Sequence, residues 1–118
     1  NEALHDHLRA RFPQVRIAHG DARQLPSLAA RSGFLADGPA DAIVSGLGLL
    51  SMSADAQRSV LEAAFACLAR DGRLIQFTYG PQPPVPAETA RDLRLQSRQG
   101  AFVLRNVPPA TVYVYWRD

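Results

Sequence analysis

Small or polar residues follow three apolar stretches of this sequence, and these are the segments best suited to bind a ligand. They are Gly20-Asp21-Ala22 after residues 15–19, Ser45-Gly46-Leu47 after residues 41–44, and Tyr79-Gly80 after residues 73–78. In open α/β sheets, ligands bind outside the carboxyl ends of the strands. These three segments are therefore the candidates for a binding site.

The remaining reactive side chains point neither to a metal site nor to a catalytic base. His5 and His7 are two residues apart on an expected helix, so they point to different faces and cannot jointly hold a metal ion. His19 lies late in an expected strand, where a core or sheet-edge histidine is the simpler interpretation. Cys67 lies near the apolar stripe of an expected helix and is better suited to packing than to nucleophilic attack. We expect no metal.

The elements that must position these candidates alternate between helix and strand. We expect helices over residues 1–12, 25–34, 53–68 and 87–95, and strands over residues 15–19, 41–45, 73–79, 101–105 and 111–117. Ser51 or Ser53 can cap the third helix, and Asp71-Gly72 is expected to end it. This order predicts an α/β fold with a parallel sheet, helices on both faces and a terminal hairpin that adds one antiparallel strand.

Length and composition exclude several classes of protein. A chain of 118 residues with 47% hydrophobic and 20% charged residues can fold as one domain and does not resemble a disordered segment. The 13 basic residues are all arginine and are spread along the chain, unlike the basic cluster of a nucleic-acid-binding arm. One cysteine excludes an internal disulfide, and no apolar run approaches the roughly 20 residues of a membrane-spanning helix.

Several segments resemble, in the right order, the class I S-adenosylmethionine-dependent methyltransferases, whose Rossmann-like sheet also ends in a hairpin. They are Gly20-Asp21-Ala22, the run from Asp41 to Leu47, and Asp71-Gly72-Arg73-Leu74. The runs from Gln76 to Pro81 and from Arg105 to Val112 narrow the resemblance to bacterial phospholipid N-methyltransferases. Gly48 departs from the pattern, because that family usually has proline there, and the change is expected to loosen the loop.

The resemblance implies a role for each candidate residue, and each has a plainer alternative. Asp21 would accept a hydrogen bond from the adenine amino group of S-adenosylmethionine and the Ala22 N–H would meet a ring nitrogen, although Asp21 can simply cap the next turn. Ser45, Gly46 and Leu47 would lie beside the transferred methyl group, or the glycines merely permit a tight turn. Tyr79 would line the amine site as the catalytic candidate, or it covers the sheet together with Phe77.

The resemblance also implies that residues 1–118 are the C-terminal part of a single methyltransferase domain. In the family's strand order, 3-2-1-4-5-7-6, strands 1 and 2 and the Gly-rich cofactor loop would precede Asn1, and a complete domain would need on the order of 150–200 residues. Strand pairing between residues 15–19 and 41–45 would contradict this topology. The 118 residues alone are then expected to be inactive.

The resulting hypothesis is a cytoplasmic enzyme that methylates phosphatidylethanolamine, with peripheral contact at the inner face of the membrane. Arg98, Arg105 and Arg117 could meet a lipid phosphate, and Tyr113, Tyr115 and Trp116 could lie at the interface, but ordinary hairpin features are the simpler interpretation. One alternative is an rRNA adenine methyltransferase, which Ser45-Gly46-Leu47-Gly48 disfavours because that family carries an Asn-Pro-Pro-Tyr-like motif there. Another is a truncated, non-catalytic binding module.

Overall fold

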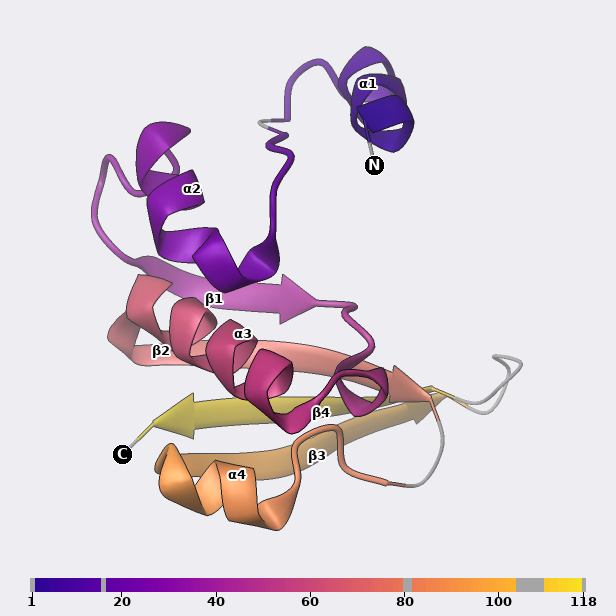
Figure 1. The fold of residues 1–118 in the computed structure, drawn as a ribbon, viewed down its shortest axis with the longest axis vertical. Coiled ribbons are helices and arrows are strands. Elements are labelled where there is room, and N and C mark those ends of the chain that lie inside the picture. Colours follow the sequence, from indigo (N-terminus) through magenta and orange to yellow (C-terminus); the bar gives the residue numbers. More distant parts are fainter. Residues whose placement is uncertain (1, 16, 80–81, 104–109, 118) are drawn as a thin grey trace.

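Four strands form one mixed sheet in the computed structural model, which describes residues 2–15, 17–79, 82–103 and 110–117. Its strands are β1 (Ala40–Ser45), β2 (Leu68–Tyr79), β3 (Leu95–Val103) and β4 (Ala110–Arg117), in the spatial order β1-β2-β4-β3 (Figure 1). β1 and β2 are parallel, whereas β4 is antiparallel to both of its neighbours. The α/β class and the single antiparallel strand of the terminal hairpin are confirmed.

The four α-helices lie close to their expected positions. They are α1 (Glu2–Arg11), α2 (Leu25–Arg31), α3 (Ala54–Cys67) and α4 (Ala87–Asp92), and the short 3-10 helices η1 (Ala22–Gln24) and η2 (Leu49–Ser51) precede α2 and α3. Of the two candidate caps of α3, Ser53 is the one used, since its Oγ accepts a hydrogen bond from the Ala56 N–H at 3.2 Å.

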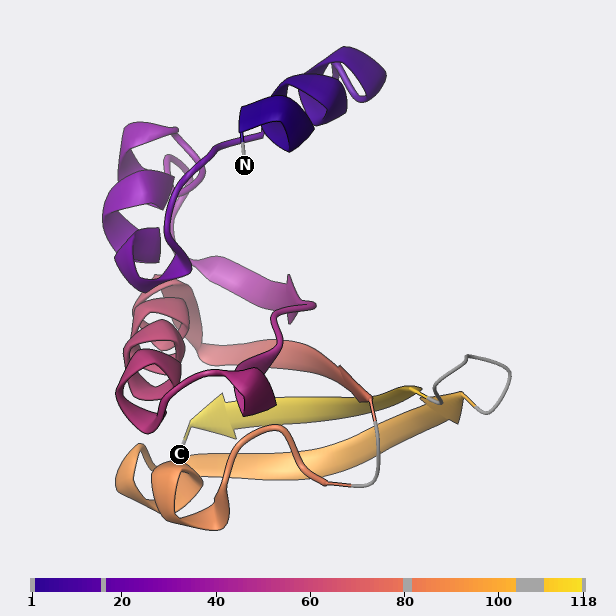
Figure 2. The same ribbon diagram turned by 45° about the vertical axis from the view of Figure 1, so that its right-hand side comes forward.

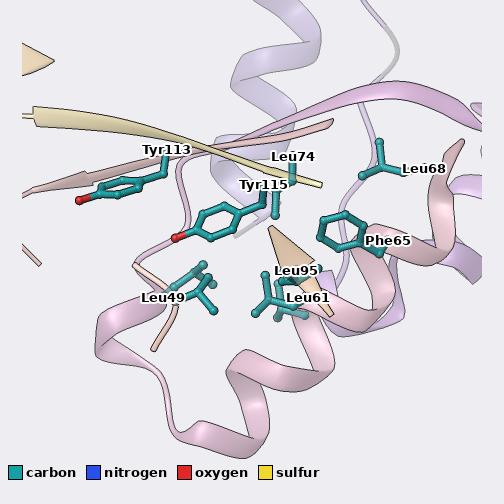
Figure 3. Packing of buried hydrophobic residues seen from close by; sticks show 10 residues of the cluster. Leu49, Leu61, Phe65, Leu68, Leu74, Leu95, Tyr113 and Tyr115 are labelled. Carbon is teal, nitrogen blue, oxygen red and sulfur yellow. The ribbon is translucent and has the colours of Figure 1, made fainter. Parts of the chain in front are cut away.

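The core lies between α3 and one face of the sheet. Leu61 of α3 is fully buried, and Leu74 of β2 and Tyr115 of β4 are almost so. Figure 3 shows the Tyr113 and Tyr115 rings side by side, with centroids 6.3 Å apart. Because α3 and the alternate residues of β2 and β4 share this apolar cluster, the carboxyl end of β1 is held against a rigid support.

Only one face of the sheet is covered by helices, so the expectation of helices on both faces is wrong for the described residues. α2, α3 and α4 lie on the same side, and α1 stands apart from the sheet (Figure 2). On the other face, Val44, Phe77 and Tyr79 are 65%, 42% and 60% exposed. Burial along β2 alternates accordingly, with Leu74, Gln76 and Thr78 buried.

The expected strand over residues 15–19 is not formed. Val15 and residues 17–19 belong to no strand, and Arg16 lies outside the described residues. The Nε2 atom of His5 lies 3.3 Å from the carbonyl oxygen of Ile17. This carbonyl therefore pairs with a side chain and not with a neighbouring strand. The pairing with residues 41–45 that would contradict the expected topology is absent from the described segments.

Two other boundaries differ from expectation for local reasons. α3 ends at Cys67 rather than at Asp71-Gly72, because Leu68 turns into an extended conformation and buries its side chain. Gly72 lies within β2, where an added Cβ would approach the Ala69 carbonyl oxygen to 3.0 Å. β3 begins at Leu95 rather than at residue 101, after Arg94 takes the left-handed conformation (φ 58°) that reverses the chain beyond α4. Arg105 lies outside the described residues.

Candidate functional site

The segment after β1 forms a tight turn at the carboxyl end of the strand. The Leu47 N–H donates to Ser45 Oγ at 3.3 Å, and the Leu47 carbonyl accepts a hydrogen bond from Gln76 Nε2 at 2.8 Å. Apart from residues 45–47, no atom of the described residues lies within 4 Å of the position that a Cβ on Gly46 would take. The turn is thus fixed at its ends and leaves open space at its centre.

One side of this turn borders an apolar cleft of about 310 Å³ between β1, η1 and α3. Four of the candidate residues contribute to it, namely Ala22, Ser45, Gly46 and Leu47. Leu25, Ile43 and Leu61 are among the side chains that make up the rest of its wall. We call this hollow the first cleft; its size and apolar lining suit a flat ring system better than a charged group.

The other side of the turn borders a second, smaller hollow of about 180 Å³. Gly46 and Leu47 line it again, and across from them lie Phe77 and Tyr79 from the end of β2. The structure therefore brings Tyr79 next to the turn but not into the first cleft. Gly80, the other candidate at this strand end, lies outside the described residues.

Asp21 caps η1, as the plainer interpretation of this residue expected. Its Oδ1 accepts from the Arg23 N–H at 2.9 Å, and its Oδ2 lies 2.6 Å from Arg23 Nη2. Hydrogen bonds from the Arg23 side chain, and then from its backbone, lower the pKa of Asp21 to about 2. The carboxylate is thus ionised at neutral pH and held beside the residues that lead into the first cleft.

The sequence reasoning missed two buried glutamines that hold this region together. Gln76 is 1% exposed and Gln57 is 4% exposed, and each donates to main-chain carbonyls of the loop between β1 and α3. A signal was present in both cases. Gln76 occupies an inward position between Leu74 and Thr78, and Gln57 precedes Val60 by three residues on the stripe of α3. A polar residue on a core-facing stripe must have an internal partner.

The histidines and the cysteine take structural positions. The rings of His5 and His19 lie 5.8 Å apart between centroids, where they connect α1 to the following segment. Cys67 is 3% exposed, and burial raises the pKa of its thiol, so the packing interpretation fits it. Within the described part of the chain, no group of three His, Cys, Asp or Glu side chains could hold a metal ion.

The hairpin residues considered for membrane contact are largely engaged within the molecule. Tyr113 and Tyr115 are buried in the core, not exposed at an interface. The guanidinium of Arg73 stacks over the Trp116 ring at 4.9 Å, and that of Arg117 stacks over Phe65 at 5.1 Å. No helix of the described segments is both long and apolar enough to cross a bilayer.

Comparison with known proteins adds no relative: no protein-family model, no curated protein and no solved structure matches this chain.

Proposed function

We propose that this chain is the C-terminal part of an S-adenosylmethionine-dependent methyltransferase that acts on the amine of phosphatidylethanolamine, leading toward phosphatidylcholine. The strand order β1-β2-β4-β3, with β4 antiparallel, supports this proposal because it agrees with strands 4, 5, 7 and 6 of the order that the sequence resemblance implies. Within the proposal, residues preceding Asn1 supply the Gly-rich loop.

The observation that carries the proposal is the pair of hollows separated by one turn. Gly46 and Leu47 line both the first cleft and the second hollow. A group-transfer enzyme must hold a donor and an acceptor on either side of a short path, with water removed from between them. A short turn whose Gly46, Leu47 and Leu49 line both hollows is suited to such a path, since beyond residues 45–47 no described atom lies near the Gly46 Cβ position.

The residues of the first cleft fit one end of the cofactor. Its apolar lining suits the faces of an adenine ring, and the ionised Asp21 beside Ala22 can accept a hydrogen bond from the ring's amino group. No acidic side chain lines the cleft among the described residues, so the ribose and amino-acid ends would rely on groups elsewhere in the domain. When bound, the cofactor supplies an electrophilic methyl group on a sulfonium.

The second hollow suits the acceptor amine. Its lining residues would orient a neutral amine toward the first cleft, where the cofactor would supply the methyl group, and the amine proton would pass to solvent. The Tyr79 ring, 60% exposed at the rim, can attract a cationic head group or the sulfonium through its face. The chain's contribution is then alignment and exclusion of water rather than proton abstraction.

Exposed apolar side chains around the second hollow favour a lipid over a nucleic acid as acceptor. Leu47, Leu50 and Phe77 line this hollow and are 37%, 44% and 42% exposed. Contacts between basic side chains and phosphates dominate binding to nucleic acids. Within the described residues, no arginine lines either hollow. Among the described residues, the rim therefore offers apolar contacts to acyl chains and no arginine to an RNA backbone.

Transfer of a labelled methyl group from S-adenosylmethionine to phosphatidylethanolamine vesicles, by the protein with its preceding residues, tests the proposal. Tyr79→Ala should reduce transfer at least about tenfold and Tyr79→Phe should restore it, if the ring face is what acts. Phe12→Ala is the matched control, because Phe12 is 45% exposed and belongs to neither hollow. Labelling of RNA instead of lipid, or binding of the cofactor without any transfer, would contradict the proposal in favour of its two alternatives.

A further inference from the structure

The loop between β1 and α3 is held by two glutamine side chains that come from different elements. Gln76 projects from β2, and its Nε2 donates to the carbonyl of Leu47 at 2.8 Å and to that of Phe77 at 2.9 Å. Gln57 projects from α3, and its Nε2 donates to the carbonyls of Leu49 at 3.0 Å and Pro84 at 3.1 Å. Each side-chain amide thus spends both of its N–H groups on main-chain oxygens.

The two carbonyls on this loop are each shared with the loop's own backbone. The Leu47 oxygen also accepts from the Leu49 N–H at 2.9 Å, and the Leu49 oxygen also accepts from the Met52 N–H at 3.1 Å. Each glutamine therefore donates to the same carbonyl oxygen that accepts the main-chain hydrogen bond of a turn in this loop. Because both side chains are almost fully buried, removing either amide would leave a loop carbonyl with its backbone donor alone.

Gln76 borders the first cleft, but its side-chain N–H groups donate to main-chain carbonyls and do not face a ligand. Both of its N–H groups are used by carbonyls, so it has none left to donate to a bound molecule. Through its donated hydrogen bonds, Gln76 acts on a ligand by fixing the position of Leu47. The same holds for Gln57, whose amide contacts reach only Leu49 and Pro84.

We propose that Gln76 and Gln57 are positioning residues that fix the wall between the first cleft and the second hollow. By holding the carbonyls of Leu47 and Leu49, they set the separation and alignment of the two ligands across Gly46 and Leu47. This inference rests on the proposed function. Its structural part, that each glutamine fixes one turn of the loop, can be tested independently of any activity.

The structural test is amide hydrogen exchange of the 118-residue chain, measured by NMR. Gln76→Met should accelerate exchange of the Leu49 amide, and Gln57→Met that of the Met52 amide, each by about tenfold or more. Gln99→Met is the control, because Gln99 is exposed on β3 and should leave both amides unchanged. Unchanged exchange at Leu49 and Met52 in the folded variants would overturn the inference. If one variant does not fold, the other still decides the outcome.

The catalytic test is the division of the effect between kcat and KM for methyl transfer by the protein with its preceding residues. A shifted wall misaligns ligands that still bind, so kcat should fall about tenfold or more while the affinity for S-adenosylmethionine changes less than threefold. If kcat and the affinity for S-adenosylmethionine fall equally, and in proportion to the loss of thermal stability, the positioning role is overturned. If the unsubstituted protein binds the cofactor yet transfers nothing, the proposed function fails, and the exchange result alone then decides whether the glutamines hold the loop.

Discussion

Replacing Gly46 by alanine is the sharpest test of a ligand at the turn between the two hollows. An added Cβ at this position meets no described atom within 4 Å outside residues 45–47, and Gly46 does not have a positive φ. The folded chain therefore accommodates the methyl group without strain. Since alanine restricts the unfolded chain more than glycine does, we expect stability to stay the same or to rise by about 0.4–1 kcal/mol.

Whereas stability should stay the same or rise, ligand binding by Gly46→Ala should become weaker. Gly46 lines both hollows, so the methyl group occupies volume that a ligand needs on either side. Forcing one extra methyl into a packed contact costs about 1–3 kcal/mol. This corresponds to a loss of affinity for S-adenosylmethionine of roughly 5- to 150-fold. The expected result is a protein that is at least as stable as the original and binds the proposed cofactor much more weakly.

Gly48→Ala is the matched control on the same loop. Its Cβ would make an ordinary contact of 3.8 Å with Ser51 Oγ, and Gly48 lines only the second hollow. It should leave cofactor affinity unchanged and weaken the use of the amine substrate. Calorimetry gives the affinities and thermal denaturation gives the stabilities. Unchanged cofactor affinity in Gly46→Ala, or a loss that parallels a loss of stability, would refute the reasoning.

Three further predictions concern the core and the shifted pKa values of Tyr115 and Asp21. Leu61→Ala, at a fully buried position, should cost about 2–5 kcal/mol in urea denaturation, whereas Leu50→Ala at an exposed one should cost less than about 0.5 kcal/mol. Burial raises the pKa of Tyr115 from 10.0 to about 12, so the contribution to stability is complete below pH 10 and is lost as the pH rises through 12. Alkaline denaturation of Tyr115→Phe should lack this loss. The lowered pKa of Asp21 contributes stability above pH 3.8 that disappears as the pH falls to about 2, and carboxyl NMR titration should show Arg23→Gln raising that pKa.

The elements that could be predicted are those whose patterns are local. The stripe of Val60, Leu61 and Ala64 with a serine cap fixed α3 to within a residue or two, because a helix needs only its own hydrogen bonds and one apolar face. Residues 15–19 show an equally regular alternation of apolar and polar side chains, yet Val15 and residues 17–19 belong to no strand. A strand exists only with a neighbour, and periodicity along one segment says nothing about whether a neighbour is beside it.

The site was predictable in its residue types but not in its connections. Small residues after an apolar strand indicated the turn at Ser45, Gly46 and Leu47, and in the structure Ser45 lines the first cleft while Gly46 and Leu47 line both hollows. The glutamines that hold the turn are 29 and 8 residues away from the carbonyls they bind. Contacts of that range follow from the packing of whole elements. Their only trace in the sequence is a polar residue on a face that should be apolar.

Asp21 shows how capping and ligand binding compete for one residue. An ionised carboxylate has about four lone-pair sites. Arg23 makes four contacts to them, two on each oxygen, from its backbone N–H, its Nε, which is shared between both oxygens, and its Nη2. An amino group on an aromatic ring would therefore have to share an oxygen with Arg23 or displace one of these donors. The ion pair holds the carboxylate charged and in place, and the use of Asp21 by a ligand would require Arg23 to yield part of this contact.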